Sequence, residues 1–181
     1  AFWMIVSDYR YVGYKKSFAD NLRLFGNKVK NSAVYKAMMA SIKTDLSLSE
    51  DRNFPRLILK DIDVASKYGQ KYTLIDFWFS YCKPCIDDMP KYKQIYERHK
   101  AKGFEYIGIS TDRTQDISNW KKVIAKNGLV WQNLLDENGV IAKEYNINKF
   151  PTTFLVDPEG KILKKDITPE ELEGFLQDNL K

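Results

Sequence analysis

The spacing of hydrophobic residues changes character near residue 50 of the chain. Before that point, apolar side chains recur every three or four residues, which places them on one face of a helix. This spacing predicts one helix over residues 18–29 and another over residues 34–42, with Ser32 as the N-cap of the second. Gly26 weakens or bends the first of these helices. The opening run Phe2–Val6 fits either a strand fragment or an apolar anchor.

From about residue 52 the pattern becomes one of alternating strands and helices. Thr73–Phe79 is an apolar run interrupted by Asp76, which is typical of a central strand buried on both faces. Pro84 then opens a helix that runs to about Lys100. The other expected elements are strands at Phe104–Ile109, Val130–Leu134, Thr152–Val156 and Lys161–Lys164, helices from Asp112 to Asn127 and around Val140–Tyr145, a turn at Asp157–Gly160, and a terminal helix opened by the capping box Thr168–Glu171.

These elements predict an α/β domain, a mixed sheet with helices packed on it, over residues 52–181. Residues 1–51 are expected to form a helical N-terminal extension that ends in a linker at Leu46–Asp51. The chain begins with Ala1 rather than Met, which favours a processed protein or the end of a truncated upstream region.

Composition and charge narrow the class of protein. The chain is 44% hydrophobic and 14% aromatic, which is typical of a globular protein and excludes a disordered one. The formal net charge is +5, and residues 1–60 carry eleven basic against five acidic side chains. These charges are dispersed singly and no nucleic-acid motif accompanies them, so we expect solvated helix faces and no nucleic-acid partner. No apolar run approaches the ~20 residues of a membrane span, so a membrane anchor is expected only in a missing N-terminal segment.

The cysteines give the most specific chemical signal. The chain has two, Cys82 and Cys85, together with a single histidine, His99, which is expected at the surface. A structural zinc site takes four ligands, so this set is too small for one within the chain, and no metal is expected. A Cys-x-x-Cys pair between a buried strand and a helix instead indicates redox chemistry.

The placement of the pair explains how it would react. At the N-cap of the helix, the unpaired N–H groups and the helix dipole stabilise the thiolate of Cys82, which is expected to be exposed. Cys85, one turn inside and shielded, then resolves the mixed disulfide that the thiolate forms with a substrate. Lys83 adds a positive charge nearby, and Pro84 makes the turn rigid.

Two segments around these cysteines carry a family resemblance. Residues 76–85, followed by Met89-Pro90, resemble the active-site strand and helix of thioredoxin, and residues 150–154 resemble the segment that holds its cis-proline. The match is closer to the TlpA/ResA-type thiol–disulfide oxidoreductases of the bacterial cell envelope, and it spans residues 52–181. Further residues that carry it are Phe54-Pro55, Leu57–Asp61, the stretch 108–112 and the closing block Phe150–Gly160. Residues 14–45 resemble, weakly, a helical segment that precedes this domain in some longer members.

The resemblance implies a thioredoxin fold, a role for each thiol and a place for the substrate. Cys82 would be the nucleophile and Cys85 the resolving thiol. Pro151 would be the cis-proline, and its loop would face Cys82 and offer the backbone of Phe150 to an extended substrate. Trp78 and Tyr81 would pack around the site.

Two acids are candidates for the proton acceptor of the second thiol. Asp76 falls where thioredoxins place a buried acid, and burial should raise its pKa. Asp88 falls where ResA-type proteins commonly place a glutamate, and the shorter side chain leaves its role open. Either carboxylate could take the proton that Cys85 must lose during resolution.

The resemblance also implies the partners, the compartment and the alternatives. Protein thiols and disulfides would be the substrates, an upstream thiol would donate electrons, and the redox-active disulfide would be the sole redox group, without a cofactor. The periplasm or another face of the envelope away from the cytoplasm is the implied location. A peroxiredoxin would need Thr or Ser three residues before its reactive cysteine, where this chain has Phe79. A non-catalytic binding module with a vestigial cysteine pair is the other alternative.

Overall fold

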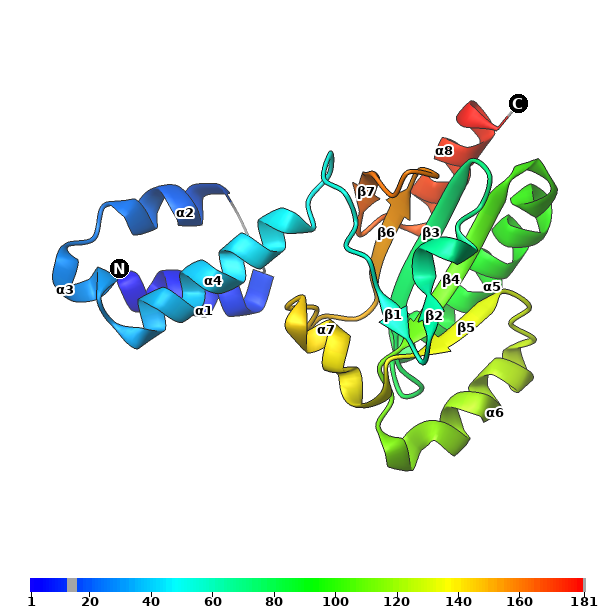
Figure 1. Ribbon diagram of the computed structural model, residues 1–181, viewed down its shortest axis with the longest axis horizontal. Coiled ribbons are helices and arrows are strands. Elements are labelled where there is room, and N and C mark those ends of the chain that lie inside the picture. The colour runs from blue at the N-terminus through cyan, green and yellow to red at the C-terminus, as the bar shows by residue number, and fades with distance from the viewer. Residues whose placement is uncertain (13–15, 181) are drawn as a thin grey trace. The chain divides into compact units, whose positions relative to one another are not determined.

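The computed structural model describes residues 1–12 and 16–180, and it divides the chain into a helical unit, Ala1–Ser47, and an α/β unit, Leu48–Lys181 (Figure 1). The division falls four residues before the expected boundary at residue 51. The reason is packing, because Leu48 is 2% exposed and belongs to the core of the α/β unit. The backbone N–H of Asp51 also donates to the carbonyl of Ile162 over 2.9 Å.

Four helices make up the described part of the helical unit: α1 (Phe2–Val12), α2 (Lys16–Arg23), α3 (Asn27–Lys30) and α4 (Ala33–Ser47). Its small core contains Val6, Leu22, Met38 and Ile42. The opening run therefore belongs to a helix rather than to a strand fragment, because Phe2, Ile5, Val6 and Tyr9 follow helical spacing and pack on one side. The helix expected over residues 18–29 is interrupted between Arg23 and Asn27, at Gly26.

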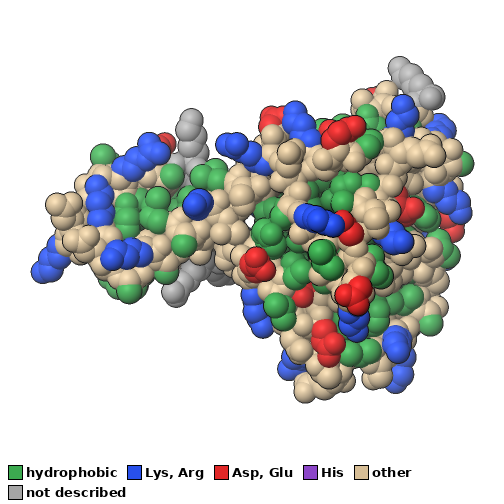
Figure 2. All heavy atoms as spheres, in the orientation of Figure 1, with side chains coloured by type: hydrophobic (Ala, Val, Ile, Leu, Met, Phe, Trp, Pro, Cys, Tyr) green, Lys and Arg blue, Asp and Glu red, His purple; other side chains and the backbone are tan. Residues whose placement is uncertain are grey.

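The expected N-cap of α4 is confirmed, because the backbone N–H of Tyr35 donates to Ser32 Oγ over 3.3 Å. The helical unit also holds the net charge of the whole chain: eight basic and three acidic residues fall within it, and charges balance in the α/β unit. On the visible face, Lys and Arg side chains are scattered rather than gathered (Figure 2). Among the described residues, no helix is both long and apolar enough to cross a membrane.

A five-stranded mixed sheet forms the centre of the α/β unit, in the order β5-β4-β3-β6-β7. β3 (Tyr72–Trp78) pairs in parallel with β4 (Phe104–Ser110), which pairs in parallel with β5 (Gln132–Leu135). On the other side, β6 (Thr152–Val156) runs antiparallel to β3, and β7 (Ile162–Lys165) runs antiparallel to β6. The α/β class and the mixed sheet are thus confirmed.

Alternate residues of β3 serve two separate cores, one on each face of the sheet. Leu74 and Trp78 contribute to the core under α5 (Lys83–His99), α6 (Ile117–Asn127) and α8 (Pro169–Asn179). Ile75 and Phe77 contribute to the core under α7 (Val140–Glu144) and the chain entering from Leu48. Asp76 has the same parity as Leu74 and Trp78, so its side chain points toward the face that α5 covers.

The local signals at the end of the chain are confirmed in detail. Thr168 and Glu171 form both hydrogen bonds of the capping box at the start of α8. The turn between β6 and β7 closes with a bond of 3.0 Å from the N–H of Gly160 to the carbonyl of Asp157.

One hairpin was not predicted: β1 (Ile58–Leu59) and β2 (Ile62–Asp63) pair antiparallel across two residues. The turn residues Lys60 and Asp61 have φ of 46° and 68°, a conformation that sequence signals associate with Gly or Asn.

Candidate active site at the start of α5

The strand β3 leads directly into the segment that carries the two cysteines. It ends at Trp78, and α5 begins at Lys83 with Cys82 as its N-cap. The sulfur of Cys82 accepts a hydrogen bond from the backbone N–H of Cys85 over 3.3 Å. The two cysteines form a disulfide. A sulfur at this position faces the unpaired N–H groups of the first helical turn, where a negative charge is favoured.

Both cysteines are buried to the same extent in this oxidised form. Each residue is 4% exposed, so the expectation that Cys82 is exposed while Cys85 is shielded is not met. The physical reason is that both belong to the core on the α5 face, against which Phe79, Ile86 and Phe150 pack.

The proline loop lies at the same end of the sheet. The Phe150–Pro151 peptide bond is cis, as expected. Thr152 pairs with Phe77 in the β6–β3 ladder, so the two residues before it continue alongside the end of β3. The rings of Phe150 and Phe79 confirm this, because they meet edge to face with centroids 5.2 Å apart. The cis-proline and the cysteines are therefore brought together from segments about seventy residues apart.

Asp76 is buried on the face of the sheet that α5 covers, and one of its two carboxylate oxygens is hydrogen-bonded. Its residue is 4% exposed, and Tyr106 Oη donates to Asp76 Oδ2 over 2.6 Å. The other oxygen, Oδ1, is buried and has no hydrogen-bond partner among the described residues. Burial raises the pKa of Asp76 to about 7; the hydrogen bond from Tyr106 lowers it and the charge of Asp88 raises it further. A carboxyl group with such a pKa can exchange protons near neutral pH.

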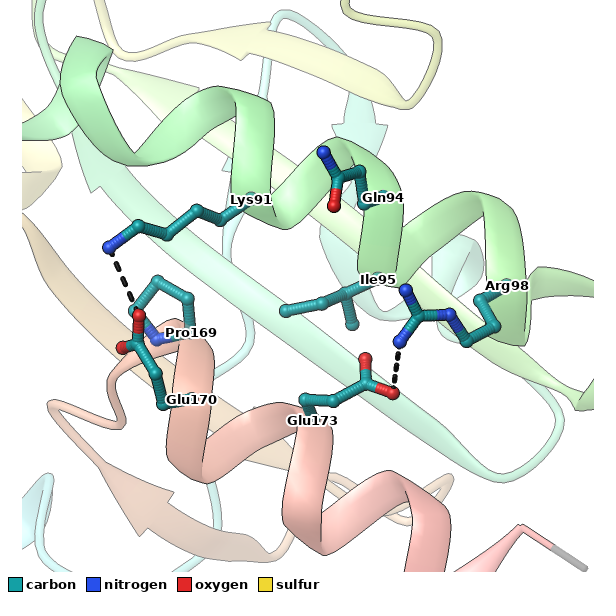
Figure 3. Close-up of a pocket in the computed structure, with 7 residues that line it drawn as sticks. All are labelled: Lys91, Gln94, Ile95, Arg98, Pro169, Glu170 and Glu173. Carbon is teal, nitrogen blue, oxygen red and sulfur yellow. Dashed lines mark hydrogen bonds and ion pairs between the residues drawn. The ribbon is translucent and has the colours of Figure 1, made fainter.

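Asp88 lies in a different environment on the outer side of α5. Its side chain is 28% exposed and pairs with Lys91 Nζ at 3.2 Å. Lys91 also pairs with Glu170 of α8 at 3.0 Å (Figure 3). Asp88 is thus partly solvated and compensated by a cation, whereas Asp76 is neither.

A groove of about 340 Å³ lies between α5 and α8. Figure 3 shows two ion pairs that cross it, Lys91 with Glu170 and Arg98 with Glu173. Neither cysteine lines this groove, so it is separate from the disulfide.

The other residues proposed to contact substrate differ in their access to solvent. Tyr81 is 62% exposed beside Cys82, and Pro84 is also exposed. Lys83 is exposed and forms an ion pair with Asp87 one turn along the helix. Trp78 is 1% exposed and lies in the core, so it packs beneath the site and offers no surface to a macromolecular substrate.

Sequence reasoning missed a buried polar network that holds the segment before Cys82. Asp112 is 3% exposed and accepts bonds from Ser80, from its backbone N–H at 2.9 Å and its Oγ at 2.6 Å. Ser110 Oγ donates to the same carboxylate, and Asn119 of α6 donates to Ser80 Oγ over 2.9 Å. The available signal is the Ser-x-Asp pattern of residues 110–112 at the end of a buried strand.

His99 was expected at the surface, but the structure buries it. It is 2% exposed, because α5 packs there against α8, and its Nε2 lies 3.3 Å from Glu173 Oε1. Within residues 1–12 and 16–180, no cluster of three or more His, Cys, Asp or Glu side chains is placed to hold a metal ion.

Comparison with known proteins agrees with this geometry. The AhpC/TSA family matches residues 45–165. Thiol-disulfide oxidoreductase ResA of Bacillus cereus is 36% identical over 130 residues, which cover 68% of this chain and 74% of the relative. Sporulation thiol-disulfide oxidoreductase A of Bacillus subtilis is 32% identical over 123 residues, which cover 66% of this chain and 73% of the relative.

Solved structures extend the agreement from sequence to fold. The thioredoxin domain of a thiol-disulfide oxidoreductase from Bacteroides vulgatus superposes with a TM-score of 0.65 at 31% identity. The superposition covers 75% of this chain and 100% of that domain. The chain therefore belongs to the AhpC/TSA family, as a thioredoxin-fold thiol–disulfide oxidoreductase of the TlpA/ResA type.

Proposed function

We propose that this thiol–disulfide oxidoreductase works through Cys82 as the attacking thiolate and Cys85 as the resolving thiol. One observation carries the proposal: the sulfur of Cys82 sits at the N-cap of α5, bonded to Cys85 one turn inside. The helix N-terminus favours the negative charge that attack requires.

The reaction begins with the reduced enzyme. The Cys82 thiolate attacks one sulfur of a substrate disulfide, forms a mixed disulfide and releases the other substrate sulfur as a thiolate. Cys85 then loses its proton and attacks Cys82 Sγ, which releases the second substrate thiol and closes the Cys82–Cys85 disulfide. Two electrons have passed from the enzyme to the substrate. A dithiol donor returns the enzyme to the reduced form by the same chemistry in reverse.

Asp76 is our proposed acceptor for the proton of Cys85. It projects from β3 toward the helix that carries Cys85, and its Oδ1 has no partner among the described residues. Burial raises its pKa to about 7, which suits proton exchange at neutral pH. Asp88 is the second candidate, because its charge acts on Asp76, although its carboxylate is already paired with Lys91.

The substrate is proposed to be an extended protein segment that lies along the cis-proline loop. Phe150 and Pro151 stand at the start of β6, beside the end of β3, where the Phe150 backbone can pair with an added strand. Tyr81, Lys83 and Pro84 are exposed next to Cys82 in the sequence and would complete the contact.

The place of action is proposed from the family resemblance. TlpA/ResA-type proteins belong to the bacterial cell envelope, so we assign this protein to the periplasm or another face of the envelope away from the cytoplasm. The electron donor would then be a dithiol protein that supplies electrons on that face.

Turnover of a protein disulfide tests the proposal. The protein should accelerate the reduction of insulin by dithiothreitol, and Cys82→Ser should abolish the acceleration. Cys85→Ser should instead accumulate mixed disulfides through Cys82, because attack proceeds while resolution cannot. Equal trapping by Cys82→Ser would overturn the assignment of the thiols.

The same preparation separates the two alternatives. Rapid consumption of hydrogen peroxide without insulin reduction would favour a peroxiredoxin. Titratable thiols in a protein that is silent in both assays would favour a binding module.

A further inference from the structure

Among the described residues, the hydroxyl of Tyr106 is the one side-chain group hydrogen-bonded to Asp76. Tyr106 Oη donates to Oδ2 over 2.6 Å, and Oδ1 is left buried without a partner among the described residues. Tyr106 stands two residues before Gly108, which pairs directly with Asp76 in the β3–β4 ladder. Residues 106 and 108 of β4 share one face of the sheet, so the phenol of Tyr106 can reach along that face to the carboxylate of Asp76.

The ring of Tyr106 is held firmly in this position. It is 1% exposed, packs against the indole of Trp131 with centroids 4.1 Å apart, and meets Tyr92 edge to face at 5.5 Å. Tyr92 directs its own hydroxyl elsewhere, to the carbonyl of Ile167 over 3.2 Å. Of these two neighbouring phenols, therefore, Tyr106 alone is bonded to Asp76.

We propose that Tyr106 is a positioning residue that gives the two oxygens of Asp76 different tasks, because it holds Oδ2 and leaves Oδ1 to receive the proton of Cys85. The inference rests on the proposed role of Asp76 as proton acceptor. A fixed Oδ2 prevents the carboxyl group from rotating, so the unbonded oxygen stays directed into the core that contains Cys85.

Other charged and titratable groups near Asp76 also influence the pH at which it loses its proton. From α5 these are Cys85, Asp88 and Tyr92, and from β4 Tyr106 itself. From α8, the charges of Glu170 and Glu171 raise the pKa of Tyr92. Burial keeps the pKa of Tyr106 well above its ordinary value, so its hydroxyl remains a donor throughout the working pH range.

Removal of the Tyr106 hydroxyl tests the inference through Asp76 itself. In the intact oxidised protein, the carboxyl ¹³C resonance of Asp76 should titrate near pH 7. Tyr106→Phe should move that midpoint upward by about one pH unit, because a hydrogen bond to the ionised form is lost. Tyr92→Phe is the matched control, since it removes a hydroxyl from the same cluster without touching Asp76, and it should leave the midpoint nearly unchanged. An unchanged or lowered midpoint in Tyr106→Phe would overturn the inference.

Kinetics of resolution supply the second readout. Reduced protein mixed with Ellman's reagent should release two coloured thiolates in sequence, the first by attack of Cys82 and the second when Cys85 resolves the mixed disulfide. At pH 7, Tyr106→Phe should slow the second phase by about fivefold and leave the first unchanged, because less of Asp76 is ionised. The difference should vanish above about pH 9. A slowed first phase, or a uniform loss at every pH, would indicate a merely structural role and contradict the inference.

Asp76→Asn separates this inference from the proposed function beneath it. If Asp76→Asn keeps the parental pH profile of the second phase, the proposed role of Asp76 fails. If Asp76→Asn loses that profile but Tyr106→Phe retains the parental one, the positioning role of Tyr106 alone fails.

Discussion

The backbone N–H of Cys85 donates to the sulfur of Cys82 over 3.3 Å, so the redox pair is also the N-cap interaction of α5. The same atoms that exchange electrons therefore satisfy one of the unpaired donors at the helix start. By contrast, Lys83, which the sequence suggested as a further source of positive charge, forms an ion pair with Asp87 in solvent. We therefore expect the helix terminus, rather than Lys83, to stabilise the thiolate of Cys82 in the reduced protein.

Lys83→Gln should therefore change the reactivity of Cys82 very little. The lysine side chain is 83% exposed and its charge is both screened and paired. The rate at which iodoacetamide alkylates reduced Cys82 at pH 6.5 should fall by less than about twofold. Asp87→Asn, which leaves Lys83 unpaired, serves as the matched control. A tenfold loss in Lys83→Gln would show that the lysine, rather than the helix, stabilises the thiolate.

Asp76→Asn should slow resolution of the mixed disulfide at neutral pH and leave the initial attack unchanged. Asn cannot accept the proton of Cys85, and general-base effects are typically about 10²- to 10⁴-fold. In the parent protein the resolution rate should rise with pH through about 7, because Asp76 loses its proton there.

Asp88→Asn is the control for this prediction, measured by single-turnover kinetics across pH. It removes the neighbouring charge that raises the pKa of Asp76, so the transition should move to lower pH and remain visible. A large loss in Asp88→Asn with unchanged rates in Asp76→Asn would transfer the base role to Asp88.

The burial of Asp76 should also cost stability at high pH. Its pKa rises from 3.8 in the unfolded reference to about 7 in the fold, so the folded state binds this proton more tightly. Its contribution is most favourable below pH 3.8 and is lost as pH rises to 7, up to about 4 kcal/mol. Asp76→Asn should accordingly raise the free energy of unfolding at pH 8 relative to the parent, with a much smaller gain at pH 4. Denaturant titrations at both pH values measure this, and an equal effect at both would contradict the buried, protonatable carboxyl.

Asp112→Ala should loosen the segment that precedes Cys82. The substitution leaves Ser80 N–H and the Ser80 and Ser110 hydroxyls without their shared buried acceptor, which should lower the free energy of unfolding by about 2–3 kcal/mol. Insulin reduction should fall with it. Glu137→Ala, which removes an acid bonded to Thr114 at the surface, is a control that should leave both nearly unchanged. If Asp112→Ala were as stable as the parent, the hydrogen-bond network would contribute nothing to the free energy of unfolding.

The sequence predicted the elements whose signals are local. A few neighbouring residues suffice to predict each of them: the apolar run of β3, the proline at the start of α5 and the capping box at Thr168. The opening helix α1 was not predicted because the continuous apolar run Phe2–Val6 hides the helical spacing of the face that packs against Leu22, Met38 and Ile42. The β1–β2 hairpin was not predicted because its turn residues, Lys60 and Asp61, adopt positive φ, whereas Gly or Asn is the usual sequence signal for such a turn.

The same distinction between local and long-range signals holds for the candidate site. The cysteine pair, the buried acid and the cis-proline were predicted, because motif and resemblance identify them by position. The hydrogen bonds of Tyr106 to Asp76 and of Ser80 to Asp112 were not, because each joins residues about thirty apart whose side chains meet only in the folded sheet. The burial of His99 also depends on a distant partner, Glu173 of α8.

The equilibrium of the Cys82–Cys85 couple in a series of thiol–disulfide buffers tests the central claim most directly. The ratio of dithiol to disulfide, read by gel shift after alkylation, gives the reduction potential. A redox-active pair should titrate as a two-electron couple at a potential above about −300 mV, within the range that exchanges with other dithiol proteins. A pair that remains oxidised in buffers well below that value would be a structural disulfide and would contradict the account.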